Sequence, residues 1–103
     1  MNSLVEQRRA QRFDLKLPLE VLSKLQHGAG LGETRNLSSG GVLFRANTAL
    51  TLGDNVEYVI TFPTPPEAKL DVRLRCVGKV VRFSPDAEVA ATLERYEFIR
   101  KAR

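Results

Sequence analysis

The sequence is poor in the residues on which metal and disulfide chemistry depends. Its 103 residues include one cysteine, Cys76, one histidine, His27, and no tryptophan. A single cysteine excludes an internal disulfide and a thiolate zinc cluster. The acidic residues are scattered singly along the chain rather than grouped around His27. We therefore expect no metal or other cofactor, and we expect Cys76 to pack as a small core residue.

Long apolar runs are missing as well. No stretch approaches the ~18 apolar residues that a transmembrane helix needs. The polar, arginine-rich start, Met1 to Arg12, has no apolar segment that could serve as the core of a signal peptide. The length fits one domain. These observations predict a cytoplasmic, soluble, single-domain protein that does not associate with membranes.

Catalytic motifs are also absent. The chain has no credible Ser/His/Asp set, no paired carboxylates in a glycine-rich context, no P-loop and no G-x-G-x-x-G that opens a helix. The glycine-rich segment 28–32 joins two expected strands, so it is interpreted as a hairpin loop rather than a phosphate-binding loop. An enzyme is the least favoured interpretation, and we expect no catalytic activity.

What the chain does have is alternation of apolar and polar residues. The period of two begins at Leu15 and recurs between segments rich in glycine, proline, asparagine and serine. Strands are expected over residues 15–21, 32–37, 42–46, 56–62 and 69–83, and again from Val89. Five or six such strands predict an all-β fold, either an antiparallel sandwich or a small barrel.

Two details of this pattern lead to further expectations. In the long strand the apolar positions change from even-numbered residues up to Cys76 to odd-numbered residues from Val77, which predicts a bulge or a barrel corner next to Gly78. Residues Tyr96, Phe98 and Ile99 leave a short C-terminal helix open as an alternative to a strand.

Basic residues gather at both ends of the chain, and the net charge is +4. Most of them are arginines, which suit bidentate recognition of a phosphate or a guanine edge. Arg8 and Arg12 form an R-x-x-x-R pattern that chance alone explains. The pattern N-x-S-x-x-G, from Asn36 through Ser38 to Gly41, is much rarer by chance. The two patterns in this order, on either side of the first strand and hairpin, form a specific combination.

With these motifs the chain resembles the PilZ domain family, whose members bind the bacterial second messenger cyclic di-GMP. The resemblance extends over nearly the whole chain, from Arg8 to Ile99. It includes the strand around Pro18, the turn at Gly53 and the segment 78–82. It implies a six-stranded antiparallel β-barrel over residues 14–103, preceded by a flexible arginine-bearing arm over residues 1–13. The last strand departs from the family pattern, because Val89–Tyr96 lacks the glycine that many PilZ domains carry there.

The resemblance also implies ligand-binding roles. Arg8 and Arg12 are expected to contact base and phosphate, Asn36 and Ser38 the guanine, and Gly41 a tight turn, with Arg9 as an additional contact. In an extended arm, Arg8 and Arg12 lie roughly 13 Å apart on one face, which suits a flat dinucleotide. The alternatives are that Asn36 and Ser38 merely cap a turn and that the arm is a solvated basic tail.

The predicted function is that of a cyclic di-GMP receptor. Binding is expected to order the N-terminal arm against the barrel, and the ordered arm would signal to an effector protein that the sequence does not identify. One alternative is a PilZ-like adaptor that has lost the ligand and works through protein contacts. Another is a small basic barrel that binds single-stranded nucleic acid, which the spread of the aromatic residues disfavours.

Overall fold

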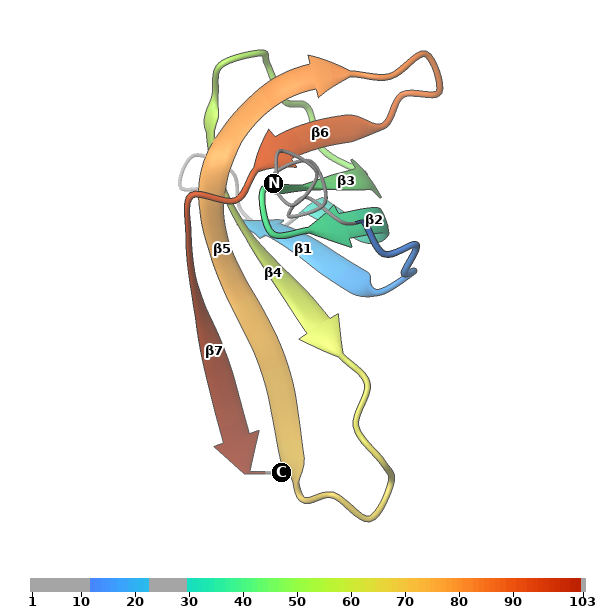
Figure 1. The fold of residues 1–103 in the computed structure, drawn as a ribbon, viewed down its shortest axis with the longest axis vertical. Helices are drawn as coiled ribbons and strands as arrows, with labels where there is room; N and C mark the ends of the chain where they lie inside the picture. The colour runs from blue at the N-terminus through green and yellow to red at the C-terminus, as the bar shows by residue number, and fades with distance from the viewer. Residues whose placement is uncertain (1–11, 23–29, 103) are drawn as a thin grey trace, which may run out of the picture.

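The computed structural model describes residues 12–22 and 30–102, and all regular structure in these ranges is β-strand (Figure 1). The seven strands are β1 (Pro18–Leu22), β2 (Gly30–Ser38), β3 (Gly41–Ala46), β4 (Asn55–Phe62), β5 (Leu70–Phe83), β6 (Val89–Thr92) and β7 (Arg95–Ala102). The all-β expectation is confirmed. The alternative of a C-terminal helix is wrong, because β7 pairs with β5 along its whole length. Its tyrosine, phenylalanine and isoleucine are strong strand formers.

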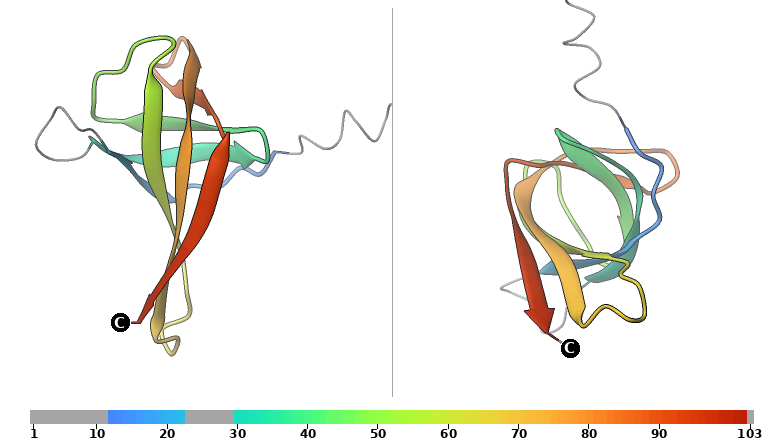
Figure 2. Two further views of the ribbon diagram at one scale, coloured as in Figure 1. Left: turned by 90° about the vertical axis from the view of Figure 1, so that its left-hand side faces the viewer. Right: turned by 60° about the horizontal axis from the view of Figure 1, so that its bottom comes forward.

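Six of the strands close into an antiparallel barrel. The sheet runs in the order β4-β1-β2-β3-β6-β5, and the pairing of β4 with β5 closes the ring. The right-hand view of Figure 2 looks into this ring. The expected six-stranded antiparallel barrel is therefore confirmed. Closure leaves no open strand edge within the ring, which is how small β-domains avoid unwanted strand pairing.

The core follows from the alternation in the sequence. Leu17, Leu19 and Val21 are buried together, as one parity of a strand requires. Tyr58 and Phe44 are fully buried, and their rings stack with centroids 5.9 Å apart. The Tyr58 hydroxyl donates a hydrogen bond to the carbonyl oxygen of Thr92 over 3.1 Å, so this buried polar group has a partner.

The long strand β5 departs from its expected phase. Even-numbered residues stay in the core as far as Val80, whereas Val81 and Phe83 are exposed. The expected change of the core positions to odd-numbered residues is wrong. A bulge does occur, but it lies at Val81, which is the extra residue in the pairing of β5 with β6. Gly78 marks a corner: a Cβ atom there would lie 1.8 Å from the carbonyl oxygen of Thr92.

β7 lies outside the ring. It pairs with residues 70–77 of β5, and β6 pairs with the same strand from Val80 onward. The far ends of β4 and β5 and the whole of β7 therefore form a three-stranded extension of the barrel. Figure 1 and the left-hand view of Figure 2 show this extension running away from the ring, with the C-terminal end at its tip.

Candidate functional site

The segment that precedes β1 lies along β2. The backbone groups of Phe13 and Leu37 exchange two hydrogen bonds of 2.9 Å, which form an isolated antiparallel bridge. Four residues further on, the N–H of Thr34 donates to the carbonyl oxygen of Leu17, also over 2.9 Å. Residues 12–17 are thus attached to the barrel at two points. This attachment brings the end of the predicted arginine arm beside the predicted N-x-S-x-x-G motif.

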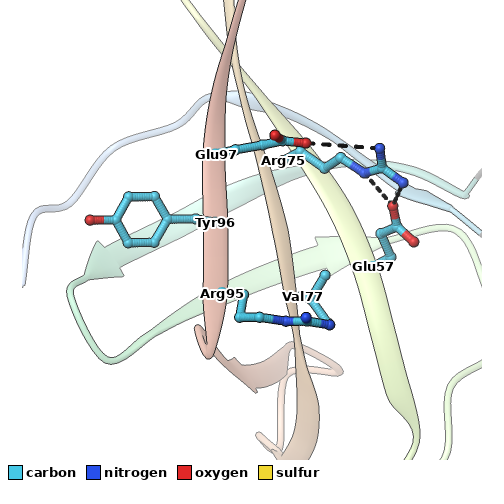
Figure 3. A pocket seen from close by; sticks show the side chains of 6 residues that line it. All are labelled: Glu57, Arg75, Val77, Arg95, Tyr96 and Glu97. Atoms are coloured by element: carbon cyan, nitrogen blue, oxygen red, sulfur yellow. Dashed lines mark hydrogen bonds and ion pairs between the residues drawn. The ribbon is translucent and has the colours of Figure 1, made fainter.

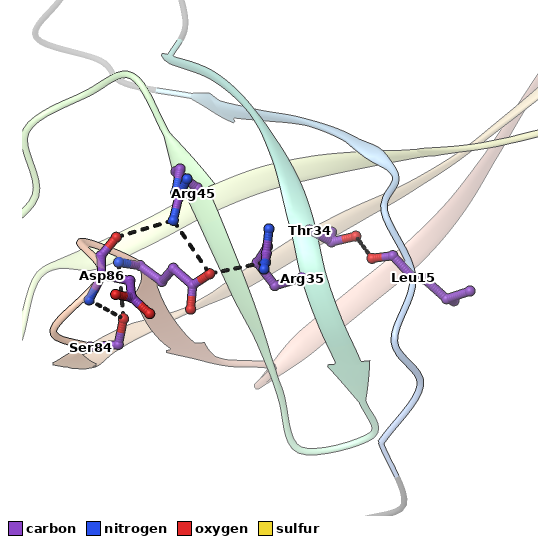
Figure 4. A network of polar contacts seen from close by, with 7 residues as sticks. Leu15, Thr34, Arg35, Arg45, Ser84 and Asp86 are labelled. Atoms are coloured by element: carbon purple, nitrogen blue, oxygen red, sulfur yellow. Dashed lines mark hydrogen bonds and ion pairs between the residues drawn. The ribbon is translucent and has the colours of Figure 1, made fainter.

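Thr34 is the residue that holds this segment, and the sequence analysis did not identify it. Its side chain is fully buried, and its hydroxyl accepts a hydrogen bond from the N–H of Leu17 over 2.9 Å. The same hydroxyl donates to the carbonyl oxygen of Leu15 (Figure 4). A threonine in an alternating strand is common, so no pattern in the sequence marks it as a positioning residue.

A β-bulge turns the motif outward. Thr34 pairs with Phe44 and Asn36 pairs with Leu43, so Arg35 is an extra residue in β2. The extra residue reverses the parity of the strand. Leu37 therefore packs against the core, and Asn36 takes the opposite face. Without the bulge, the side chains of Asn36 and Ser38 would point into the barrel, as that of Thr34 does.

Arg12 reaches Asn36 across this surface. One terminal N–H of its guanidinium donates a hydrogen bond of 3.2 Å to the side-chain oxygen of Asn36. The structure thus brings together one residue from each of the two predicted motifs. Among the described residues this bond leaves polar groups of both side chains available, because a guanidinium has five N–H donors and an amide also has an NH₂ group. Arg8 and Arg9 lie outside the described residues.

Ser38 and Gly41 close the turn between β2 and β3. The Ser38 hydroxyl accepts from the N–H of Gly40 and donates to the carbonyl oxygen of Gly41, each over 3.3 Å. These two bonds support the alternative that Ser38 caps a turn. A Cβ atom at Gly41 would lie 2.6 Å from the carbonyl oxygen of Ala91, so close packing against β6 requires glycine here.

The buried carboxylate of Glu88 also holds the bulge at Arg35 in place. Glu88 is largely buried and forms ion pairs with Arg35 at 3.0 Å and with Arg45 at 3.7 Å. Arg45 also donates to the carbonyl oxygen of Asp86 over 3.2 Å. Figure 4 shows these contacts between β2, β3 and the loop that precedes β6. A buried charge is costly unless it is paired, so this network fixes Arg35 and the bulge.

The strand register places a row of side chains next to Asn36. Leu43, Ala90 and Arg82 follow in the neighbouring strands β3, β6 and β5. Leu43 and Ala90 alternate with core residues, so they face outward, and both are half-buried. In the closed six-stranded ring β5 is three strands away from β2, so Arg82 lies on the opposite side of the barrel from Asn36. Next to Asn36 itself, Leu43 and Ala90 form a low apolar floor.

A separate hollow opens between β4, β5 and β7. It is lined by Glu57, Arg75, Val77, Arg95, Tyr96 and Glu97 (Figure 3). Arg75 is ion-paired with Glu57, and its distance to Glu97 is 4.0 Å, so its charge is already balanced. None of the predicted site residues that the structure describes lines this hollow, and we do not assign the ligand site to it.

Two other kinds of site receive no support from the described residues. No group of three or more histidine, cysteine, aspartate or glutamate side chains is gathered there in a way that could hold a metal ion. Within the same ranges, no helix has the length and apolar character needed to cross a lipid bilayer.

The fold and the arrangement of Arg12 and Asn36 define a small β-barrel with a polar face. The chain belongs to the PilZ domain family, which it matches over residues 6–99. PilZ domains generally bind cyclic di-GMP and act as binding and effector domains rather than catalysts. No curated protein matches the chain.

Proposed function

We propose that this protein is a cyclic di-GMP receptor whose ligand lies between residues 8–12 and the outward face of β2 and β3. The observation that carries the proposal is the contact between Arg12 and Asn36, which joins the two motifs 24 residues apart. The ligand offers two phosphate charges and two guanine bases, and arginine recognises both. The protein would act in the cytoplasm, where a receptor meets an internal second messenger.

The surroundings of Asn36 suit a planar base. Leu43 and Ala90 offer a flat apolar surface, and Asn36 supplies both donor and acceptor groups at its edge. In this arrangement a guanine would stack over the floor while Arg12 contacts its edge or the adjoining phosphate. Ser38 and Gly41 would support the site by holding the turn.

Binding would also bring the rest of the arm to the barrel. Arg12 is already placed beside Asn36, so contacts from Arg8 and Arg9 to the same ligand would fix residues 1–11 next to β2. The fixed arm would present a new surface to an effector protein, which is the signalling step we propose. Each charge-assisted hydrogen bond contributes roughly 1.5–3 kcal/mol, enough for the ligand to drive such a change.

The test is isothermal titration calorimetry with cyclic di-GMP, with GTP as the control ligand. Arg12→Ala and Arg8→Ala are each expected to weaken binding about tenfold or more. Arg73→Ala is the matched control, because Arg73 is an exposed arginine on the extension and its loss should leave the affinity unchanged. Unchanged affinity in Arg12→Ala would refute the assigned site. Absence of any heat with the unmodified protein would favour the ligand-free adaptor.

A further inference from the structure

The outer edge of β7 has no partner strand among residues 12–22 and 30–102. The directions of its backbone N–H and C=O groups follow from the hydrogen bonds that β5 makes. The N–H of Val80 donates to the carbonyl oxygen of Asp54, the residue before β4, so even-numbered residues of β5 bond toward β4 and odd-numbered ones toward β7. The odd-numbered residues of β7 therefore bond to β5. The even-numbered residues of β7 direct their N–H and C=O groups to the open edge.

Four of the eight residues at this edge are charged, which discourages unselective strand pairing, but the edge lacks a proline and a bulge. β7 has eight residues and contains no proline or glycine, and its pairing with β5 has no bulge. One of its faces carries exposed aromatic side chains, Tyr96 at 62% and Phe98 at 50% exposure. Phe98 also contacts Phe62, with ring centroids 6.2 Å apart. An exposed aromatic face that borders an open edge indicates an interaction surface.

When two copies of β7 are related by a two-fold axis, charged side chains of one copy can face opposite charges of the other. Antiparallel pairing of β7 with its own copy can place Ile99 opposite Ile99, and Glu97 of each copy then faces Lys101 of the other. The hydrogen-bonding residue Phe98 faces Arg100 of the second copy, and within one chain Arg100 already lies 5.7 Å from the Phe98 ring centroid. The neighbouring register, with Phe98 opposite Phe98, instead places Arg95 opposite Lys101 twice, and like charges directly opposite are destabilising.

We propose that β7 is a homodimerisation edge, and that two copies pair antiparallel with Ile99 opposite Ile99. The extension of each barrel then continues into the other as one six-stranded sheet in the order β4-β5-β7-β7-β5-β4. The aromatic faces of the two extensions lie on the same side, because residues of equal parity face each other. The surface is distinct from Asn36 and its neighbours, so dimer formation does not depend on the proposed ligand.

The experiment is sedimentation equilibrium of the full chain at concentrations up to about 1 mM, which covers even a weak Kd. The unmodified protein is expected to dimerise. Glu97→Lys and Lys101→Glu should each weaken the dimer roughly tenfold, because each replaces two attractive cross-strand pairs by two repulsive ones. An equimolar mixture of these two variants should restore dimers, because every facing pair is then of opposite charge. The double variant that carries both substitutions should dimerise like the unmodified chain.

Lys79→Glu is the control, since it makes the same charge change on exposed β5 surface outside β7 and should not alter dimerisation. Several outcomes would overturn the proposal. A chain that stays monomeric at all concentrations would rule out β7 as a homodimerisation edge. Dimers that are unaffected by Glu97→Lys would place the interface elsewhere. Stronger dimers in Lys101→Glu would indicate the other register, in which the new carboxylate faces Arg95. The mixture experiment remains decisive if one variant alone folds poorly.

Discussion

Two regions of the molecule are built from strands of the same kind but expose different groups. One is the proposed ligand face, which comprises Arg12 and the outward side of β2 and β3, and the other is the extension. At the ligand face every strand is paired on both edges, so only side chains are available, and a bulge at Arg35 determines which of them point outward. On the extension, β7 keeps one edge open, so its backbone is available as well. A surface on which all strand edges are paired, and which presents fixed polar side chains, suits a small charged ligand. An open edge beside aromatic side chains suits another strand.

The largest expected effect comes from removing the corner that separates the two regions. Gly78→Ala would place a Cβ atom against the Thr92 backbone, at 1.8 Å from its carbonyl oxygen, so β5 could not pass β6 without rearrangement. We expect a loss of about 3 kcal/mol or more in the free energy of unfolding, measured by urea denaturation.

Gly40→Ala is the matched control for this change. A Cβ atom at Gly40 meets nothing within 4 Å. The substitution is expected to change stability by less than about 1 kcal/mol, in the direction of a gain, because alanine restricts the unfolded chain. Equal stability losses in the two variants would show that the corner does not depend on the close approach at Gly78.

The next largest effect is expected at the ligand face and not at the extension. Thr34→Val keeps the shape of the side chain but removes the hydroxyl that binds the N–H of Leu17 and the carbonyl oxygen of Leu15. We expect a loss of about 1–3 kcal/mol, because a buried N–H loses its partner. Binding of cyclic di-GMP should weaken too, since the segment that carries Arg12 is released from β2.

Thr34→Ser tests this reasoning, because it keeps the hydroxyl and should restore most of the binding. Dimerisation should stay unchanged in both variants, since β7 makes no contact with this segment in the strand pairing. Weaker dimers in Thr34→Val with intact ligand binding would contradict the separation of the two regions.

A smaller effect is expected on the far side of the ring. Arg82→Ala should leave cyclic di-GMP binding within about twofold, because three strands separate Arg82 from Asn36 and its exposed charge acts on the ligand only through screened long-range attraction. Calorimetry at low and high salt measures the difference. An affinity as low as that of Arg12→Ala would make Arg82 a principal contact and would contradict the assigned site.

The residues that sequence analysis found and missed differ in a physical way. Alternation predicted the strands of an antiparallel sandwich or barrel, because the period of two reflects a buried and an exposed face, and the family resemblance selected the barrel. It also identified Arg12 and Asn36, which the structure brings together. Arg8 and Arg9 stay predictions, as do the ligand roles of the other motif residues.

The missed features depend on tertiary contacts. The bulges at Arg35 and Val81 arise where β2 and β5 pair with neighbouring strands, and a single strand's sequence does not record its partner's register. The apparent phase change in β5 was misread because Val81 and Phe83 are apolar yet exposed. The terminal strand was ambiguous for a similar reason, since β7 has no face that is fully buried.

The smallest effect probes the border between barrel and extension. Cys76 and Tyr96 are direct partners in β5 and β7, yet Cys76 is fully buried and Tyr96 is 62% exposed. Burial raises the pKa of the Cys76 thiol to about 12 from its ordinary value of 9.0. The folded protein therefore holds this proton more tightly than the unfolded chain, and stability is lost as the pH rises above 9.

Between pH 8 and pH 9.5 we expect this thiol to reduce the free energy of unfolding by about 0.8 kcal/mol, a loss that Cys76→Ala should not show. Urea denaturation at the two pH values measures it. Native-state reaction of the thiol with a disulfide reagent should be slow and should follow unfolding. Rapid labelling of the folded protein would show that the barrel is open at this end.

The most direct measurement of the central claim is a titration of the isotopically labelled full chain with cyclic di-GMP, followed by backbone amide NMR shifts. The account predicts large shifts at Arg12, from Asn36 to Gly41 and at Ala90, while Tyr96 to Ala102 stay unchanged. Shifts concentrated along β7 and the hollow near Arg75, with none at Asn36, would contradict it.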